Sequence, residues 1–198
     1  MILVRADQAK SLRSVMEFNE EKLVEVVRPY LLRARAGDWS HALRGVKWVK
    51  ELGIGRDDLF LIITAAYIHD IGWSGVAPTG KIDLGELLKL EPQANQNSDQ
   101  LINEVLSVLQ FSDSEIEIVQ RLVKAADRHS SVEEDEEIIV DADSLSKLCL
   151  EHLKEKFQLD SFSEVVDMWE KEFPNRIKTS KAKNLFPALL SKLKQDIL

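Results

Sequence analysis

The sequence has only one cysteine, Cys149, among its 198 residues. A single thiol excludes a disulfide within the chain and suits a reducing compartment. Long hydrophobic segments are also missing, because the longest apolar run, LFLIITAAYI, is about half as long as a membrane span. The start of the chain, MILVRADQAK, shows no charged start followed by an apolar stretch, so no secretory signal is evident. These absences predict a soluble, cytoplasmic protein without a membrane partner.

Net positive charge is missing as well. The chain carries 26 Lys and Arg against 34 Asp and Glu, for a formal charge of −8. Binding to a nucleic-acid polymer needs an excess of basic residues, so no such partner is expected. A small phosphorylated substrate remains compatible with this charge, because a bound divalent cation can reverse the local field. The 44% hydrophobic and 30% charged residues are ordinary for one globular domain.

The apolar pattern predicts an all-α, compact bundle of about seven or eight helices. No stretch alternates apolar and polar residues over a useful length, so essentially no sheet is expected. The segment 59–68 is apolar all round, which is typical of a helix buried at the centre of a domain. Gly and Pro punctuate 71–97, which we expect to be the least regular part, with a helix resuming near Ser98. Later helices are predicted over 138–157 and 178–198.

Capping signals indicate where some helices begin. Asp38 or Ser40 is placed to cap one helix, and Ser112 with Glu115 three residues later has the form of a capping box. The acidic run 133–137 is expected to be a loop or the first turn of a helix. These signals support the helical reading of the chain.

Polar residues that could take part in catalysis or metal binding stand beside the most apolar helix. His69 and Asp70 directly follow LFLIITAAYI, where the core meets the surface. Because burying an unpaired carboxylate is costly, Asp70 should have a cation or strong donors nearby. His41 lies early in the preceding helix, and Arg44 shares its face one turn later.

A second acidic pair, Asp141 and Asp143, follows the apolar residues 138–140 and is expected to precede a helix. Two imidazoles and two carboxylates from three helices could surround one divalent ion. Mixed nitrogen and oxygen ligands suit manganese, iron, cobalt, nickel or zinc better than calcium. The residues themselves therefore favour a metal site at this place.

The segments DWSHALRGV, AAYIHDIG and IIVDADSL, in this order, resemble the HD-domain superfamily of metal-dependent phosphohydrolases. The resemblance covers about residues 38–148, over half of the chain. It implies a single HD-like helical domain over 1–198, with helices in 150–198 packing on the core formed by the motifs.

The resemblance also implies a set of metal ligands. Asp143 is preferred to Asp141 because it occupies the ADxL position of the family, and Asp141 would orient a ligand or water instead. The resemblance implies one divalent ion, with manganese, iron, cobalt, nickel, zinc or magnesium as candidates. The implied ligands are His41, His69, Asp70 and Asp143.

Some residues depart from the family pattern. Many relatives have Lys or Glu three residues after the HD aspartate, where this chain has Trp73. No histidine lies between Asp70 and Arg128, which favours one metal over two. His129 resembles a later histidine near the site mouth of the family. His152, among charged neighbours, is expected on the surface.

The function implied by the resemblance is hydrolysis of a small phosphoester or nucleotide by a metal-activated water. Asp70 would position or deprotonate that water, while Arg44, Lys81 or His129 would steady the phosphate. The alternative is a catalytically inactive HD-fold module for ligand binding or interaction, which the presence of Trp73 mildly favours.

Overall fold

The computed structural model describes residues 18–78, 80–81 and 84–197. This part of the chain contains no strand, which confirms the prediction of an all-α bundle, and no helix in it is long and apolar enough to cross a membrane. Nine α-helices and two short 3-10 helices lie within it, slightly more than the seven or eight expected. In chain order they are α2 (Glu20–Leu31), α3 (Asp38–Leu52), α4 (Leu59–Ile68), η1 (Ile71–Trp73), α5 (Leu84–Val108), α6 (Asp113–Asp127), α7 (Glu134–Lys147), α8 (Leu150–Lys156), η2 (Leu159–Ser161), α9 (Phe162–Arg176) and α10 (Ser180–Asp196).

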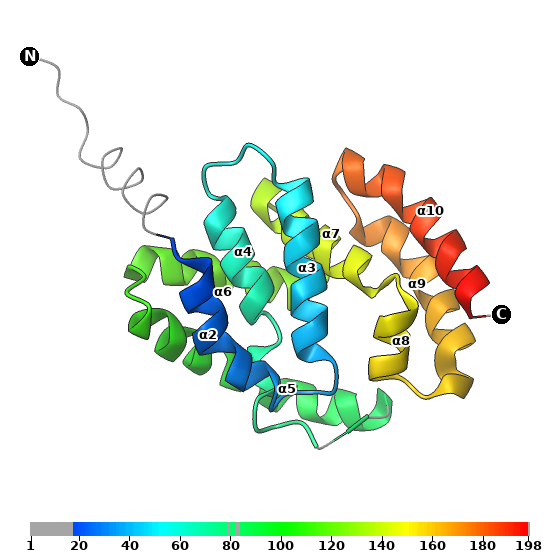
Figure 1. Cartoon of the computed structure of the whole chain (residues 1–198), viewed down its shortest axis with the longest axis horizontal. Helices are drawn as coiled ribbons and strands as arrows, with labels where there is room; N and C mark the ends of the chain where they lie inside the picture. The colour runs from blue at the N-terminus through cyan, green and yellow to red at the C-terminus, as the bar shows by residue number, and fades with distance from the viewer. Residues whose placement is uncertain (1–17, 79, 82–83, 198) are drawn as a thin grey trace, which may run out of the picture.

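Helix α4 lies inside the main hydrophobic core. Every residue from Leu61 to Ile68 is buried, because the segment has no charged residue to turn toward water. Helices α2, α3, α6 and α7 contact α4, and Figure 1 shows it among them. The prediction that this helix has no face open to solvent is confirmed.

A second hydrophobic cluster connects the C-terminal helices to the rest of the protein. Trp48 and Leu52 of α3 contact both clusters. Figure 1 shows α8, α9 and α10 at one end of the molecule and α2 and α6 at the other. The C-terminal helices therefore pack against α3 and α7. Buried members of this second cluster include Leu145, Leu153, Trp169, Phe173 and Phe186.

Helix α5 is longer than the sequence suggested. The prediction that 71–97 is irregular is wrong for its second half, where α5 runs straight through Pro92. Proline removes the hydrogen bond to the carbonyl of Leu88, four residues earlier, and its ring crowds that carbonyl. Leu88 is 57% exposed, so water can reach this side of the helix. The Asn97 side-chain amide donates to the carbonyl oxygen of Gly72 (2.8 Å) and fastens α5 to the turn after α4.

Helix α7 begins earlier and ends sooner than expected. The acidic run forms its first turn, with Glu133 and Glu136 making a capping box. The single helix predicted over 138–157 is wrong, because Leu148 leaves the helical conformation (φ −81°, ψ 54°) to bury its side chain. Asp143 consequently lies inside α7 instead of ahead of a helix.

Gly72 lies where α5 approaches the turn after α4 most closely. A Cβ atom there would lie 2.2 Å from the carbonyl oxygen of Ala94 and 2.9 Å from Cβ of Ser98. We expect Gly72→Ala to destabilise the protein by about 1–3 kcal/mol through overpacking. Gly45→Ala is the matched control, because nothing lies within 4 Å of a Cβ there, and alanine should stabilise α3 by up to about 1 kcal/mol. Urea unfolding compares the two variants, and equal stabilities would contradict the close contact.

Candidate metal centre

Three helices bring a buried group of possible metal ligands together. His41 stands in the first turn of α3, His69 directly follows α4, and Asp143 lies within α7. One ligand atom from each residue lies within 4.8 Å of the other two, and all three residues are buried. The structure thus assembles three of the four predicted ligands into a group that could hold a metal ion, and this group contains Asp143 and not Asp141.

His41 lies between a hydroxyl and a carboxylate. Its Nδ1 lies 3.0 Å from the hydroxyl oxygen of Ser146, and its Nε2 lies 3.0 Å from Oδ1 of Asp143. The Ser146 hydroxyl donates to the carbonyl oxygen of Asp143 (2.7 Å), so its oxygen can accept from Nδ1 of His41. The imidazole is uncharged at neutral pH, because burial lowers the pKa of His41 to about 3. With its proton on Nδ1, the ring offers the Nε2 lone pair to a cation beside Asp143.

His69 directs a second lone pair toward the same place. Its Nδ1 lies 2.9 Å from the carbonyl oxygen of Ala66, which can only accept, so Nδ1 carries the proton. Nε2 is buried and has no hydrogen-bond partner among the described residues. It lies 3.7 Å from Oδ1 of Asp143 and 3.6 Å from Oδ2 of Asp70. Because a buried acceptor without a donor is costly, this arrangement favours a cation.

One carboxylate oxygen of Asp70 binds a cation, and the other faces the two histidines. Oδ1 accepts from Nη2 of Arg35 at 2.5 Å. Burial alone would raise the pKa of Asp70, but the Arg35 guanidinium holds it well below its ordinary value. Within the described part of the chain, Oδ2 is buried without a hydrogen-bond partner, 4.0 Å from Nε2 of His41. Asp70 therefore presents one oxygen at the edge of the group, where the sequence predicts the fourth ligand.

His41, His69 and Asp143 place their ligand atoms where one divalent ion could contact all three, and Asp70 lies just outside this group. The pairs measured above are separated by 3.0 to 4.0 Å. Two ligands that each lie about 2.0–2.2 Å from one ion are themselves about 3–4 Å apart. Two nitrogens and two carboxylate oxygens match the preference of manganese, iron, cobalt, nickel or zinc, whereas calcium prefers oxygen alone.

Three cations that sequence analysis missed surround the carboxylates. Nζ of Lys147 lies 2.6 Å from Oδ2 of Asp143 and, against the effect of burial, holds the pKa of Asp143 well below its ordinary value. Nε of Arg35 donates to Asp38 (3.2 Å), which also accepts from Lys156. Only Lys147 carried a sequence signal, because it stands four residues after Asp143 on one helix.

Arg44 and His152 lie differently from what we expected. Nε of Arg44 donates to a carbonyl oxygen of α7 (3.3 Å) and Nη2 donates to Glu155 (2.9 Å), so the guanidinium joins α3 to α7 and α8. A phosphate contact by Arg44 is not supported. His152 is only 3% exposed, because its ring packs against His41 on one side (centroids 4.9 Å apart) and Trp169 of α9 on another (5.7 Å).

Asp141 has a structural partner instead of a place at the metal group. Its two oxygens accept from the backbone N–H groups of Lys178 (2.9 Å) and Thr179 (2.8 Å), just before α10. The expectation that Asp141 orients a ligand or water is therefore wrong. Its fully buried carboxylate anchors the start of α10 to α7.

His129 stands in the turn that follows α6. Its backbone is left-handed (φ 52°), which is uncommon outside glycine, and its Nδ1 lies 2.7 Å from the carbonyl oxygen of Ala126. Burial lowers the pKa of His129, and Lys147 lowers it further, while Asp143 acts in the opposite direction.

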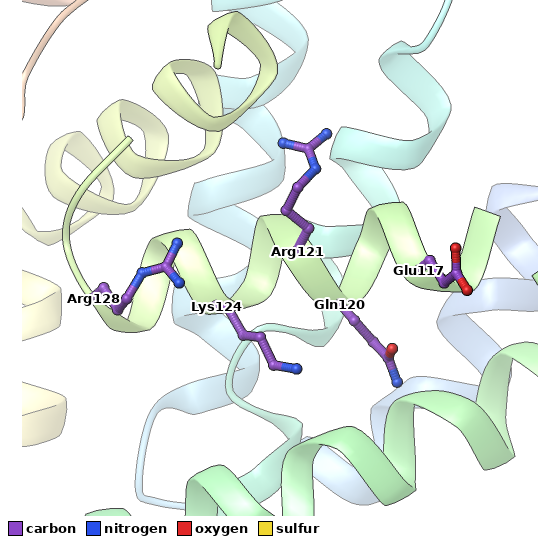
Figure 2. A pocket seen from close by; sticks show the side chains of 5 residues that line it. All are labelled: Glu117, Gln120, Arg121, Lys124 and Arg128. Atoms are coloured by element: carbon purple, nitrogen blue, oxygen red, sulfur yellow. The ribbon is translucent and has the colours of Figure 1, made fainter. Parts of the chain in front are cut away.

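Two hollows flank α6. Figure 2 shows the larger, of about 210 Å³, with Arg121 on one side of the helix and Gln120 and Lys124 pointing toward α5. Arg121 is bound by Asp135 (2.5 Å between Nη2 and Oδ2), so it is not free to hold a ligand. The smaller hollow, of about 130 Å³, lies between α5 and α6 and is lined in part by Asp127.

Asp127 is a carboxyl group that the sequence gave no reason to single out. Burial and the negative charge of Asp70 raise the pKa of Asp127 to about 7, and Asp143 contributes in the same direction while His69 opposes it. Asp127 therefore lines the smaller hollow and responds to the charges of the metal group. A carboxyl with this pKa holds its proton in about half of the molecules at neutral pH.

We expect Asp127→Asn to change how the stability of the metal-free protein depends on pH. The folded pKa of about 7 lies above an unfolded value of about 3.9. The folded wild type therefore binds the extra proton, and stability falls as pH rises toward 7. The variant lacks this titration, so its advantage over wild type should be larger at pH 8 than at pH 5, by on the order of 1–2 kcal/mol after solvent screening. Urea unfolding in EDTA measures it, and a difference independent of pH would contradict the assignment.

Comparisons with known proteins found no relative. No protein-family model matches the chain, no curated protein matches it, and no solved structure matches it. The argument for function therefore depends on the geometry of the site and on the order of its residues.

Proposed function

We propose that this protein is a metal-dependent phosphohydrolase of the HD type that acts on a small phosphoester or nucleotide. The observation that carries the proposal is the buried group of His41, His69 and Asp143, whose ligand atoms lie within 4.8 Å of one another. Beside it, Nε2 of His69 and Oδ2 of Asp70 are buried without a hydrogen-bond partner among the described residues. Buried polar groups that converge without partners are more typical of a functional site than of packing. The order of these residues along the chain resembles the HD superfamily, which supports the reaction class.

The chain's own residues prepare the ligands for one divalent ion, with manganese, iron, cobalt, nickel, zinc or magnesium as candidates. The carbonyl of Ala66 accepts from Nδ1 of His69, and the Ser146 hydroxyl oxygen, 3.0 Å from Nδ1 of His41, would accept from it in the same way once Nε2 binds an ion. A bound ion would supply Lewis acidity to a phosphoryl oxygen and lower the pKa of a bound water. The proposed ligands are His41, His69, Asp70 and Asp143.

Asp70 is better placed to orient the attacking water than to remove its proton. Arg35 fixes Oδ1 and keeps the pKa of Asp70 well below its ordinary value, which makes this carboxylate a weak base. The remaining oxygen, Oδ2, can accept a hydrogen bond from a water. Asp127, with a pKa of about 7, is better matched to holding and releasing a proton at neutral pH.

The charge and the cysteine content of the chain support a small phosphorylated substrate and a cytoplasmic location for this activity. The formal charge of −8 disfavours a nucleic-acid polymer as substrate and leaves a small phosphorylated compound, drawn by local positive charge. The single cysteine, Cys149, suits the reducing cytoplasm.

The test is metal analysis of the purified protein, followed by a panel of phosphate esters and nucleotides with manganese, cobalt, nickel or magnesium. We expect one metal ion per chain and metal-dependent release of phosphate from at least one compound. Metal bound without release from any compound would overturn the proposal and favour a ligand-binding module. Trp73 favours this alternative, because many HD proteins have Lys or Glu at this position. In this protein the Arg35 guanidinium lies over the Trp73 ring, 4.3 Å from its centroid.

A further inference from the structure

Three carboxylates around the metal group are paired with three cations through direct contacts. Arg35 contacts Asp38 and Asp70, and the other cations each contact one carboxylate. The set of three carboxylates and three cations is Asp38, Asp70, Asp143, Arg35, Lys147 and Lys156.

A divalent ion added to this balanced set leaves two positive charges without counter-charge inside the protein. Because uncompensated buried charge is costly, the loaded site favours an anion of matching charge. A phosphomonoester carries nearly two negative charges at pH 7, since its second pKa is about 6. A phosphodiester carries one. Charge balance therefore favours a phosphomonoester, in an argument that rests on the proposed metal site.

Lys147 is the cation with donors to spare beside a metal ligand. An ammonium has three N–H groups, and the structure gives Lys147 one hydrogen-bond partner among the described residues, Oδ2 of Asp143. Arg35 is held by two carboxylates, and Lys156 contacts only Asp38, which is outside the ligand group. The Lys147 side chain is 17% exposed, so its other N–H groups can reach a molecule at the surface of the site.

Lys147 is placed to reach an anion bound at the metal group. Its Nζ lies 2.6 Å from Oδ2 of Asp143, one of the proposed ligands, and its side chain is partly exposed. We propose that Lys147 binds the phosphate of the substrate, and that the substrate is a phosphomonoester dianion.

The experiment uses the full chain loaded with Mn²⁺ and isothermal titration calorimetry at pH 7. The probes are methyl phosphate, a monoester, and dimethyl phosphate, a diester of similar size. We expect methyl phosphate to bind at least about 10-fold more tightly than dimethyl phosphate. Lys147→Met should lower the affinity for methyl phosphate by about 10- to 100-fold, the effect of losing a charged hydrogen bond, while one Mn²⁺ stays bound. Lys147→Arg should retain most of it.

Lys124→Met is the matched control, because this lysine is exposed, pairs with Asp99 and contacts no residue of the metal group. It should leave both affinities unchanged. Equal affinity for the two probes, or unchanged binding of methyl phosphate by Lys147→Met, would overturn the inference while the metal site stands. Protein that binds no Mn²⁺ would overturn the proposed function and this inference together. Selective binding of methyl phosphate without turnover of any ester would support phosphate binding by Lys147 and would refute only the proposed hydrolysis.

Discussion

Asp143→Asn protein is expected to purify as a folded helical protein that holds no stoichiometric metal and releases no phosphate. Asp143 is a carboxylate close to both histidines, with Oδ1 3.0 Å from Nε2 of His41 and 3.7 Å from Nε2 of His69. Asparagine keeps the shape of the side chain but removes its charge. The loss of metal affinity should exceed the roughly 10- to 100-fold that follows removal of an outer partner of a ligand. Elemental analysis and Mn²⁺ titration measure it, with circular dichroism to verify folding.

Asp141→Asn is the matched control for this experiment, because it makes the same change two residues away on the same helix. Asp141 binds backbone N–H groups ahead of α10, so the variant should lose about 1–2 kcal/mol of stability and keep its metal. The reverse ranking, with metal lost from Asp141→Asn and kept by Asp143→Asn, would show that the wrong aspartate of the pair has been assigned to the ion.

The parts of the fold that the sequence predicted well are those governed by local chemistry. Residues 59–68 are apolar on all sides and could only be central, while Ser112 and Glu115 form the capping box that their spacing indicates. Boundaries set by tertiary contacts were not predictable. Helix α5 continues through Pro92 because it packs on the turn at Gly72, and α7 stops at Lys147 because the next side chain turns into the core.

The candidate site was predictable to a similar degree. His41, His69 and Asp143 could be found because their order along the chain resembles the HD superfamily, and the structure brings their ligand atoms together. Arg35 and Lys156 could not, because a buried cation has no periodic signature and its counter-charge comes from distant parts of the chain. His152 was missed for a related reason. Its charged neighbours in LEHLKEKF suggest an exposed helix, and only the position of α9 buries this histidine.

The buried ion pairs of Asp38 lead to the largest expected change in stability. Asp38 is 0% exposed and accepts from the backbone N–H of Arg35 (2.8 Å), from Nε of Arg35 (3.2 Å) and from Nζ of Lys156. Asp38→Ala would leave two cations inside the protein with Asp70 as their one remaining carboxylate neighbour in this network. Uncompensated buried charge costs about 3–5 kcal/mol, which is the loss that we expect in the free energy of unfolding. Urea unfolding in EDTA at pH 7 measures it.

Two further variants separate this effect from the loss of a side chain in general. Asp58→Ala removes an exposed partner of Arg56 and should lower stability by less than about 1 kcal/mol. Adding Lys156→Met to Asp38→Ala removes one of the stranded cations and replaces it with an apolar side chain of similar length, so the double variant should be more stable than Asp38→Ala alone. The opposite result is a loss of stability in the double variant that equals the sum of the losses caused by Asp38→Ala alone and by Lys156→Met alone. In that case the two residues do not interact, and the stability of this region comes from packing and not from charge balance.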